Sequence, residues 1–216
     1  MADSVPEARP TKRRGVTIIG ASALVALWLT MMIGGTGSLD LALLQALYSA
    51  HKPALRSFAM FVTLFGQWQA VILLSLIAAG WLVHRRHRHT ALLLLSITLI
   101  GRVLVEFQKF GIHRLRPTAT EHLVPVQSLS FPSAHAANSM ILLLTLALLA
   151  PPREHRWWTV PLALFGTFCV GISRPMLGVH WPSDVIGGWS FGAAWVLAMV
   201  AVAERWPAKR EESARR

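Results

Sequence analysis

The stretch Gly178–Gly188 reads GVHWPSDVIGG and stands between two long apolar runs. It holds a histidine, a proline and an aspartate, with His180 and Asp184 four residues apart. If the flanking runs cross a membrane, polar side chains are costly at this position, and ionisable residues there usually mark a functional site. The pair is therefore a candidate for function, and its meaning depends on what the apolar runs are.

The composition indicates a multi-pass membrane protein. The chain has 216 residues, of which 54% are hydrophobic and only 14% are charged, against roughly 25% charged residues in soluble domains. The net charge is +11, but the basic residues fall in short clusters between apolar runs. That distribution favours membrane orientation over nucleic-acid binding, so no nucleic-acid partner is expected. With a single cysteine, Cys169, no intramolecular disulfide can form.

Six apolar segments predict an all-α integral membrane bundle. They cover residues 16–34, 68–84, 90–107, 134–150, 157–173 and 184–203, each near the about 20 residues that cross a bilayer. Residues 39–65 mix charged and apolar residues, which predicts one or two amphipathic helices at the interface, with a tilted extra span as the alternative. The first apolar run is longer than a signal-peptide core, so we expect an uncleaved span, with cleavage near Gly37 as the alternative.

Basic residues predict the orientation of the bundle. The two terminal tails, the 84–89 link that reads HRRHRH and the link after residue 150 all carry arginines, and six spans place them on one side. The positive-inside rule makes that side the cytoplasm. We therefore expect a cytoplasmic basic tail at 1–15, a six-span domain at 16–203, a cytoplasmic tail at 204–216 and a cell (inner) membrane location. The segments 35–67, 108–133 and 173–184 then face the periplasm or exterior.

Three outward-facing segments carry the residues for phosphate chemistry: KFGIHRLRP, SFPSAHAAN and SRPMLGVHWPSD. Lys109, Arg116 and Arg174 provide three cations, and guanidinium groups match phosphate oxygens with two-pronged geometry. Ser133 follows a proline and precedes a helical run, so it is a plausible helix N-cap. The backbone N–H groups of Ala134 and His135 would then lie at the positive end of a helix, which favours anions.

Two histidines complete this set. One could attack phosphorus, and the other could protonate a leaving oxygen. If the chain turns into a helix at Pro182, His180 and Asp184 lie one turn apart. The carboxylate would then accept the Nδ1 proton and leave Nε2 free to attack, as the aspartate does in a serine-protease triad.

The three segments together resemble the signature of the type 2 phosphatidic acid phosphatase family, KxxxxxxRP, PSxH and SRxxxxxHxxxD. Every spacing matches, in the family's order. The resemblance implies that His180 is the nucleophile that forms a phosphohistidine, that Asp184 orients it and that His135 protonates the leaving group. It also implies phosphate binding by Lys109, Arg116, Ser133, the amide of Ala134 and Arg174. No metal and no other cofactor is implied, and Ala134 replaces a common glycine.

The resemblance implies a metal-independent hydrolase of lipid phosphates or diphosphates, whose partners are its substrate and membrane lipids. Undecaprenyl diphosphate, phosphatidylglycerophosphate and phosphatidic acid are the candidates; we favour the first as a recycled lipid carrier. The sequence does not separate them or give an oligomeric state. The rival from another class is a membrane transporter or channel that binds an anion without turnover. A vanadate-binding haloperoxidase shares a similar constellation, but six apolar runs argue against a soluble protein.

For the charged residues near the first motif, we prefer interpretations that give them no role in catalysis. Arg102 and Glu106 lie four residues apart on the third segment, so mutual neutralisation is expected, with an ion-pair ladder that positions Lys109 as the alternative. His113 and Arg114 lie inside the motif and are expected to be solvated loop residues, with head-group contact as the alternative.

Overall fold

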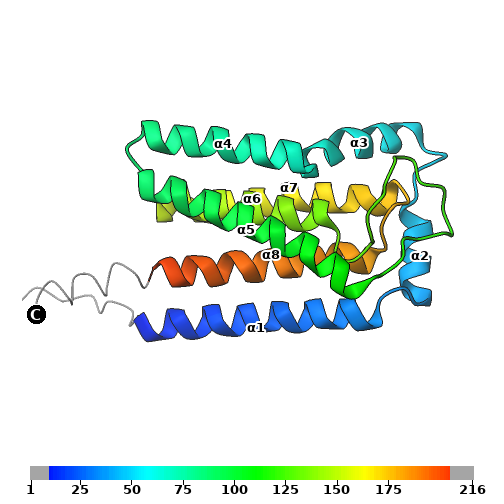
Figure 1. Cartoon of the computed structure of the whole chain (residues 1–216), viewed down its shortest axis with the longest axis horizontal. Helices are drawn as coiled ribbons and strands as arrows, with labels where there is room; N and C mark the ends of the chain where they lie inside the picture. Colours follow the sequence, from blue (N-terminus) through cyan, green and yellow to red (C-terminus); the bar gives the residue numbers. More distant parts are fainter. Residues whose placement is uncertain (1–9, 205–216) are drawn as a thin grey trace, which may run out of the picture.

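The computed structural model describes residues 10–204, and all regular structure within them is helical (Figure 1). The expected cytoplasmic tails at 1–15 and 204–216 therefore lie largely outside the described residues. The helices are α1 (Pro10–Gly34), α2 (Ser38–Leu47), α3 (Pro53–Thr63), α4 (Trp68–His84), α5 (Arg88–Ile112), α6 (Ala134–Leu149), α7 (Arg156–Met176) and α8 (Pro182–Ala203). Short 3₁₀ turns cover Leu64–Gly66 and Arg153–His155.

The six expected apolar segments correspond to α1 and α4–α8, which run along one common direction (Figure 1). Four of them, α1, α5, α7 and α8, contain segments long and apolar enough to cross a membrane, and α3 with α4 qualifies as a fifth, broken span bent by 55°. With 16 residues, α6 is shorter than a span. The chain is thus a multi-pass membrane protein with four or five candidate spans, and six spans remain a prediction.

The short helix α6 lies at the centre of the bundle. It packs against α5, α7 and α8, and most of its side chains are buried. A helix enclosed by protein does not have to match the bilayer thickness, because its ends can meet polar groups or a cavity instead of lipid. Its shortness therefore follows from its place in the bundle and leaves room for a polar site at its N-terminal end.

The stretch expected to be amphipathic forms two helices. Figure 1 shows α2 lying across one end of the bundle, whereas α3 continues along the bundle to meet α4. The structure confirms that two helices form here, and α3 with α4 also qualifies as one bent span, which is close to the alternative of an extra span. Their depth in the membrane stays a prediction.

Close packing holds α8 against the start of α6. At Gly188, an added Cβ would lie 2.7 Å from the carbonyl oxygen of Ser133 and 3.1 Å from the backbone nitrogen of Ala137, so only glycine allows this approach. The Ser133 N–H also donates to the carbonyl oxygen of Asp184 at 3.0 Å. The second and third motifs are thereby fixed against each other.

The loop 113–133 and the 177–181 link lie at the same end of the bundle as α2 (Figure 1). The α4–α5 and α6–α7 links lie at the opposite end, with the start of α1 and the end of α8. The motif segments therefore share one end, as expected, and the described basic links share the other. Which end faces the cytoplasm stays a prediction.

Candidate active site

A cavity of about 620 Å³ brings the three motifs together at this end of the bundle. Its lining includes Lys109, Arg116, Ala134, His135, Arg174 and His180, together with residues from the α3–α4 junction. The two imidazoles thus face one cavity, as the proposed chemistry requires. Ser133 and Asp184 are absent from the lining; both are fully buried next to it.

The expected pair of His180 and Asp184 is formed. Their Nδ1 and Oδ2 atoms lie 3.2 Å apart, and both side chains are almost completely buried. Pro182 occupies the first position of α8, as the sequence predicts, and Asp184 accepts from the backbone N–H of Trp181 at 2.9 Å. The carboxylate therefore caps the helix and orients the histidine at once, so the structural and catalytic interpretations of this aspartate are compatible.

Arg116 determines the tautomer and the protonation state of His180, the candidate nucleophile. Its Nη1 lies 3.2 Å from Nε2 of His180. A guanidinium has only donors, so Nε2 is the acceptor and the single imidazole proton lies on Nδ1, towards Asp184. Burial, and then the nearby cations Arg116, Lys109 and Arg174, lower the pKa of His180 well below its ordinary value. The ring is thus neutral, in the tautomer that leaves the Nε2 lone pair available for attack.

The three cations of the motifs are held by neutral oxygens. Lys109 donates to the carbonyl oxygen of Leu129 at 2.7 Å, and Arg174 donates to Oγ1 of Thr63 at 2.5 Å. Lys109 and Arg174 are each 3% exposed. Within residues 10–204, none of the three cations forms an ion pair with a carboxylate. Since burial of unpaired charge is costly, this arrangement favours an anion in the cavity.

The N-terminus of α6 adds donors to the same anion site. Ser133 is the N-cap residue, as expected, but its hydroxyl makes no capping bond. Its Oγ and the Nε of Arg174 are buried and have no hydrogen-bond partner within the described chain. Phosphate oxygens accept from hydroxyl, guanidinium and helix N-terminal N–H groups alike, so all of these donors are of the kinds that bind phosphate.

Arg114 is not a solvated loop residue, and that expectation is wrong. Its side chain is 8% exposed and forms an ion pair with Asp184 at 2.9 Å. It also donates to Oγ of Ser183 at 3.0 Å and to the carbonyl oxygens of Met31 and Met32 at 2.7 and 2.6 Å. Arg114 therefore ties the end of α1 to the aspartate that orients the candidate nucleophile. Its neighbour His113 is exposed, as expected.

Two more supporting residues were absent from the sequence interpretation. Ser130 donates to Oδ2 of Asp184 at 2.5 Å. Asp40, in the first turn of α2, accepts from the backbone N–H and the hydroxyl of Ser183 at 2.8 and 2.5 Å. Asp40 also accepts from the backbone N–H of Thr36 at 2.8 Å, but Ser183 lies 143 residues away, so no local pattern could identify that contact. The only signal in the sequence is a carboxylate within a stretch expected to be amphipathic.

Arg102 and Glu106 also differ from expectation, because they do not neutralise each other. Within residues 10–204 neither side chain forms an ion pair, and both line the cavity. The guanidinium of Arg102 lies over the ring of Trp68, 5.4 Å from its centroid. Helix α5 directs both side chains towards the cavity. An ion-pair ladder to Lys109 is therefore not formed either.

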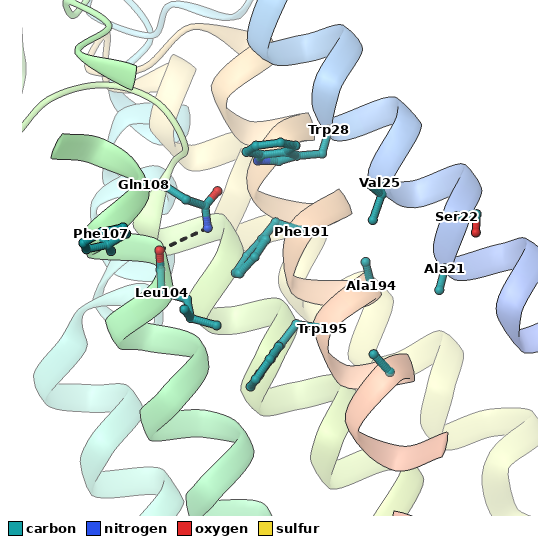
Figure 2. Close-up of a pocket in the computed structure, with 11 residues that line it drawn as sticks. Ala21, Ser22, Val25, Trp28, Leu104, Phe107, Gln108, Phe191, Ala194 and Trp195 are labelled. Carbon is teal, nitrogen blue, oxygen red and sulfur yellow. Dashed lines mark hydrogen bonds between the residues drawn. The ribbon is translucent and has the colours of Figure 1, made fainter. Parts of the chain in front are cut away.

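A second cavity of about 640 Å³ lies between α1, α5 and α8 and is apolar. Figure 2 shows its lining side chains, including Trp28 from α1, Gln108 from α5 and Phe191 and Trp195 from α8. Gln108 turns its amide nitrogen to the carbonyl oxygen of Leu104 at 3.1 Å. None of its lining residues is titratable or belongs to the three motifs, so the candidate chemistry lies in the other cavity.

Comparisons with known proteins agree with this geometry. The model of the PAP2 superfamily matches residues 90–207. An undecaprenyl-diphosphatase of Sulfolobus acidocaldarius is 32% identical over 63% of this chain and 66% of its own length. Phosphatidylglycerophosphatase B of Bacillus subtilis is 31% identical over 72% of this chain and 78% of its own.

Solved structures agree as well. The PAP2-type phosphatidylglycerolphosphate phosphatase of Bacillus subtilis superposes with a TM-score of 0.77 at 27% identity, over 86% of this chain and 96% of that one. Aquifex aeolicus LpxE shares the fold, with a TM-score of 0.62 at 19% identity, over 77% of this chain and 98% of that one.

Proposed function

Because the chain belongs to the PAP2 superfamily and is a hydrolase acting on phosphate esters, we propose that it hydrolyses a phosphate or diphosphate ester of a membrane lipid through a phosphohistidine at His180. One observation carries the proposal: His180, paired with the buried Asp184, faces the same cavity as three cations that lack carboxylate partners. A neutral nucleophile and an anion clamp are what phosphoryl transfer needs.

In the first step, Nε2 of His180 attacks phosphorus while the bond to the leaving oxygen breaks. His135, in its protonated form, gives its proton to that oxygen, so the lipid alcohol or lipid monophosphate departs neutralised. Asp184 accepts the Nδ1 hydrogen bond and stabilises the positive charge that develops on the ring. Lys109, Arg116 and Arg174 stabilise the phosphoryl oxygens, so the proposed steps do not use a metal.

In the second step, a water molecule attacks the phosphohistidine. The now neutral His135 takes one proton from that water, the P–O bond forms and the P–N bond breaks. Inorganic phosphate leaves, and both histidines return to their starting states. Ser133 and the amide of Ala134 hold the phosphoryl group in both steps. Ala134 lines the cavity. Its methyl side chain leaves the backbone N–H donor of this residue in place.

The relatives support lipid substrates without deciding between them. Undecaprenyl diphosphate and phosphatidylglycerophosphate correspond to the names of two relatives, and phosphatidic acid belongs to the same chemical class. The sequence-based preference for undecaprenyl diphosphate stays a proposal. So do the six-span domain at 16–203, the cell (inner) membrane location and a site that opens to the periplasm or exterior.

The test is phosphate release from these three lipids by the purified full-length protein in detergent. His180→Asn should lose about 10⁴–10⁶-fold in kcat, the loss expected for one member of a catalytic unit. His51→Asn is the matched control, because His51 is exposed and makes no hydrogen bond within the described chain. Normal turnover by His180→Asn would refute the nucleophile.

A trapping experiment tests the intermediate separately. Rapid alkaline quenching of the enzyme with a substrate radiolabelled in its terminal phosphate should give protein-bound label that is stable in base and labile in acid. His180→Asn should give none, whereas His135→Ala should accumulate it from a substrate with a good leaving group. Binding of the lipid without any phosphate release would instead favour the transporter or channel.

A further inference from the structure

We propose that Arg102 binds a second anionic group of the substrate and so makes the enzyme selective for lipids that carry another phosphate beside the scissile one. The proposal rests on the proposed function, because it concerns the same cavity. It assigns a specificity-determining role to a residue outside the three motifs.

The first observation is the position of Arg102 on α5. It precedes Lys109 by seven residues, which places both on one face of the helix, about 10 Å apart along its axis at roughly 1.5 Å per residue. Both side chains line the cavity. Lys109 belongs to the site of the reacting phosphate, so Arg102 marks a second position deeper in the cavity, towards the lipid tail of a bound substrate.

The second observation is that the charge of Arg102 is unpaired. Within residues 10–204 its side chain forms no hydrogen bond and no ion pair, and its guanidinium lies over the Trp68 ring, 5.4 Å from the centroid. A guanidinium within a candidate membrane span is costly and faces a cavity or a partner. Stacking on a ring leaves the N–H edge of the guanidinium free, and that edge matches phosphate oxygens.

The remaining lining of the cavity is suited to a group that links two phosphates. Gln67, Gln69 and Gln127 are neutral hydrogen-bonding residues, and Glu106 lies between Lys109 and Arg102 on α5. A carboxylate at this intermediate position accepts from a hydroxyl and repels another anion. The order cation, acceptor, cation therefore fits a second phosphate beyond a hydroxylated linker better than one joined through a bridging oxygen.

The experiment compares three short-chain lipids in mixed micelles: phosphatidic acid, phosphatidylglycerophosphate and a polyprenyl diphosphate. The first has one phosphate, the second has two across a glycerol, and the third has two across an oxygen. Arg102→Gln should lower kcat/KM for phosphatidylglycerophosphate and the polyprenyl diphosphate, the two lipids with a second phosphate. The expected loss is about 10- to 100-fold, the range lost with a charge-assisted hydrogen bond. It should leave phosphatidic acid nearly unchanged.

The matched control is Arg85→Gln. Arg85 lies over Trp81 at 5.9 Å, at the other end of α4, and does not line the cavity. This variant removes the same kind of arginine–tryptophan contact and should change no substrate. The larger of the two losses caused by Arg102→Gln identifies the second anion as a phosphodiester or as part of a diphosphate.

The outcomes are distinguishable. An equal loss on all three lipids, or no loss on any, overturns the role of Arg102 and identifies it as an anchor to bulk lipid head groups or a packing residue. If the wild-type enzyme releases phosphate from none of them, the proposed function itself fails, and this proposal fails with it. If Arg102→Gln does not fold, Arg102→Lys takes its place, because it keeps the charge and loses the two-pronged geometry; its loss should be smaller and equally selective.

Discussion

Replacement of Arg114 by methionine should lower both the stability of the bundle and its turnover. The guanidinium makes four hydrogen bonds, to Asp184, Ser183, Met31 and Met32. Removing one partner of a buried ion pair costs about 3–5 kcal/mol, because the other charge is left uncompensated. Hydrogen bonds between membrane helices average only about 0.6 kcal/mol, so the pair with Asp184 dominates the loss.

On the scale of about 2–4 °C per kcal/mol for a chain of this length, the loss corresponds to a fall in Tm of roughly 6–20 °C. Turnover should fall by about 10²-fold, the effect of a displaced catalytic group. KM should change little, because Arg114 does not line the cavity. Thermal unfolding in detergent and phosphate release by the same preparation measure both effects.

A control and a double variant make the reasoning refutable. Arg153 pairs with Glu204 at 2.8 Å, but the two side chains are 64% and 52% exposed, so Arg153→Met should cost at most about 1 kcal/mol. In the double variant with Asp184→Asn, the buried charge is gone and part of the stability lost in Arg114→Met should return. If Arg114→Met is as mild as Arg153→Met, or if the double variant is less stable than Arg114→Met, Arg114 does not compensate Asp184.

Two further predictions concern the same region. A Cβ at Gly35 would lie 2.4 Å from Oγ of Ser183 and 2.5 Å from Nη1 of Arg114, whereas Gly34 has no such neighbour within 4 Å; Gly35→Ala should therefore reduce kcat and Tm, and Gly34→Ala should not. Equal effects of the two alanines in the phosphatase and unfolding assays would contradict the close approach of α1. The lowered pKa of His180 predicts that protonation of this nucleophile does not reduce kcat/KM, corrected for ionisation of the substrate phosphate, until the pH falls below about 6.5, the ordinary pKa. The unfolded chain binds the extra proton first, so stability should also fall with pH below about 6.5, and an acid limb of kcat/KM above that value would contradict the neutral nucleophile.

The parts of the site that follow local rules could be predicted from the sequence. The pairing of His180 with Asp184 needs only a helix that starts at Pro182, and Ser133 needs only the proline before it and the helix after it. Three motifs at fixed spacing then place the remaining cations. Such features depend on residues within one or two turns of each other, where helix geometry determines proximity.

The parts that depend on how distant helices meet could not be predicted. Arg114 contacts Met31 across 83 residues, and no periodicity in either segment records that contact. The spacing of Arg102 and Glu106 permits an ion pair, but α5 turns both towards the cavity, and Arg102 lies over Trp68. The number of spans depends on tertiary packing in the same way, because α6 is a short helix that other helices enclose.

The contact between Arg116 and His180 indicates how an anion would release the nucleophile. Nη1 of Arg116 donates to Val179 at 2.5 Å as well as lying 3.2 Å from Nε2 of His180, and its Nε donates to the carbonyl oxygen of Ser128 at 2.7 Å. The guanidinium is thus held by the main chain even when the imidazole contact breaks. A phosphate oxygen is charged and accepts more strongly than a neutral imidazole nitrogen, so we infer that bound phosphate draws Arg116 away from Nε2. The same anion that supplies the electrophilic phosphorus then exposes the lone pair that attacks it, while Nδ1 keeps its proton directed at Asp184.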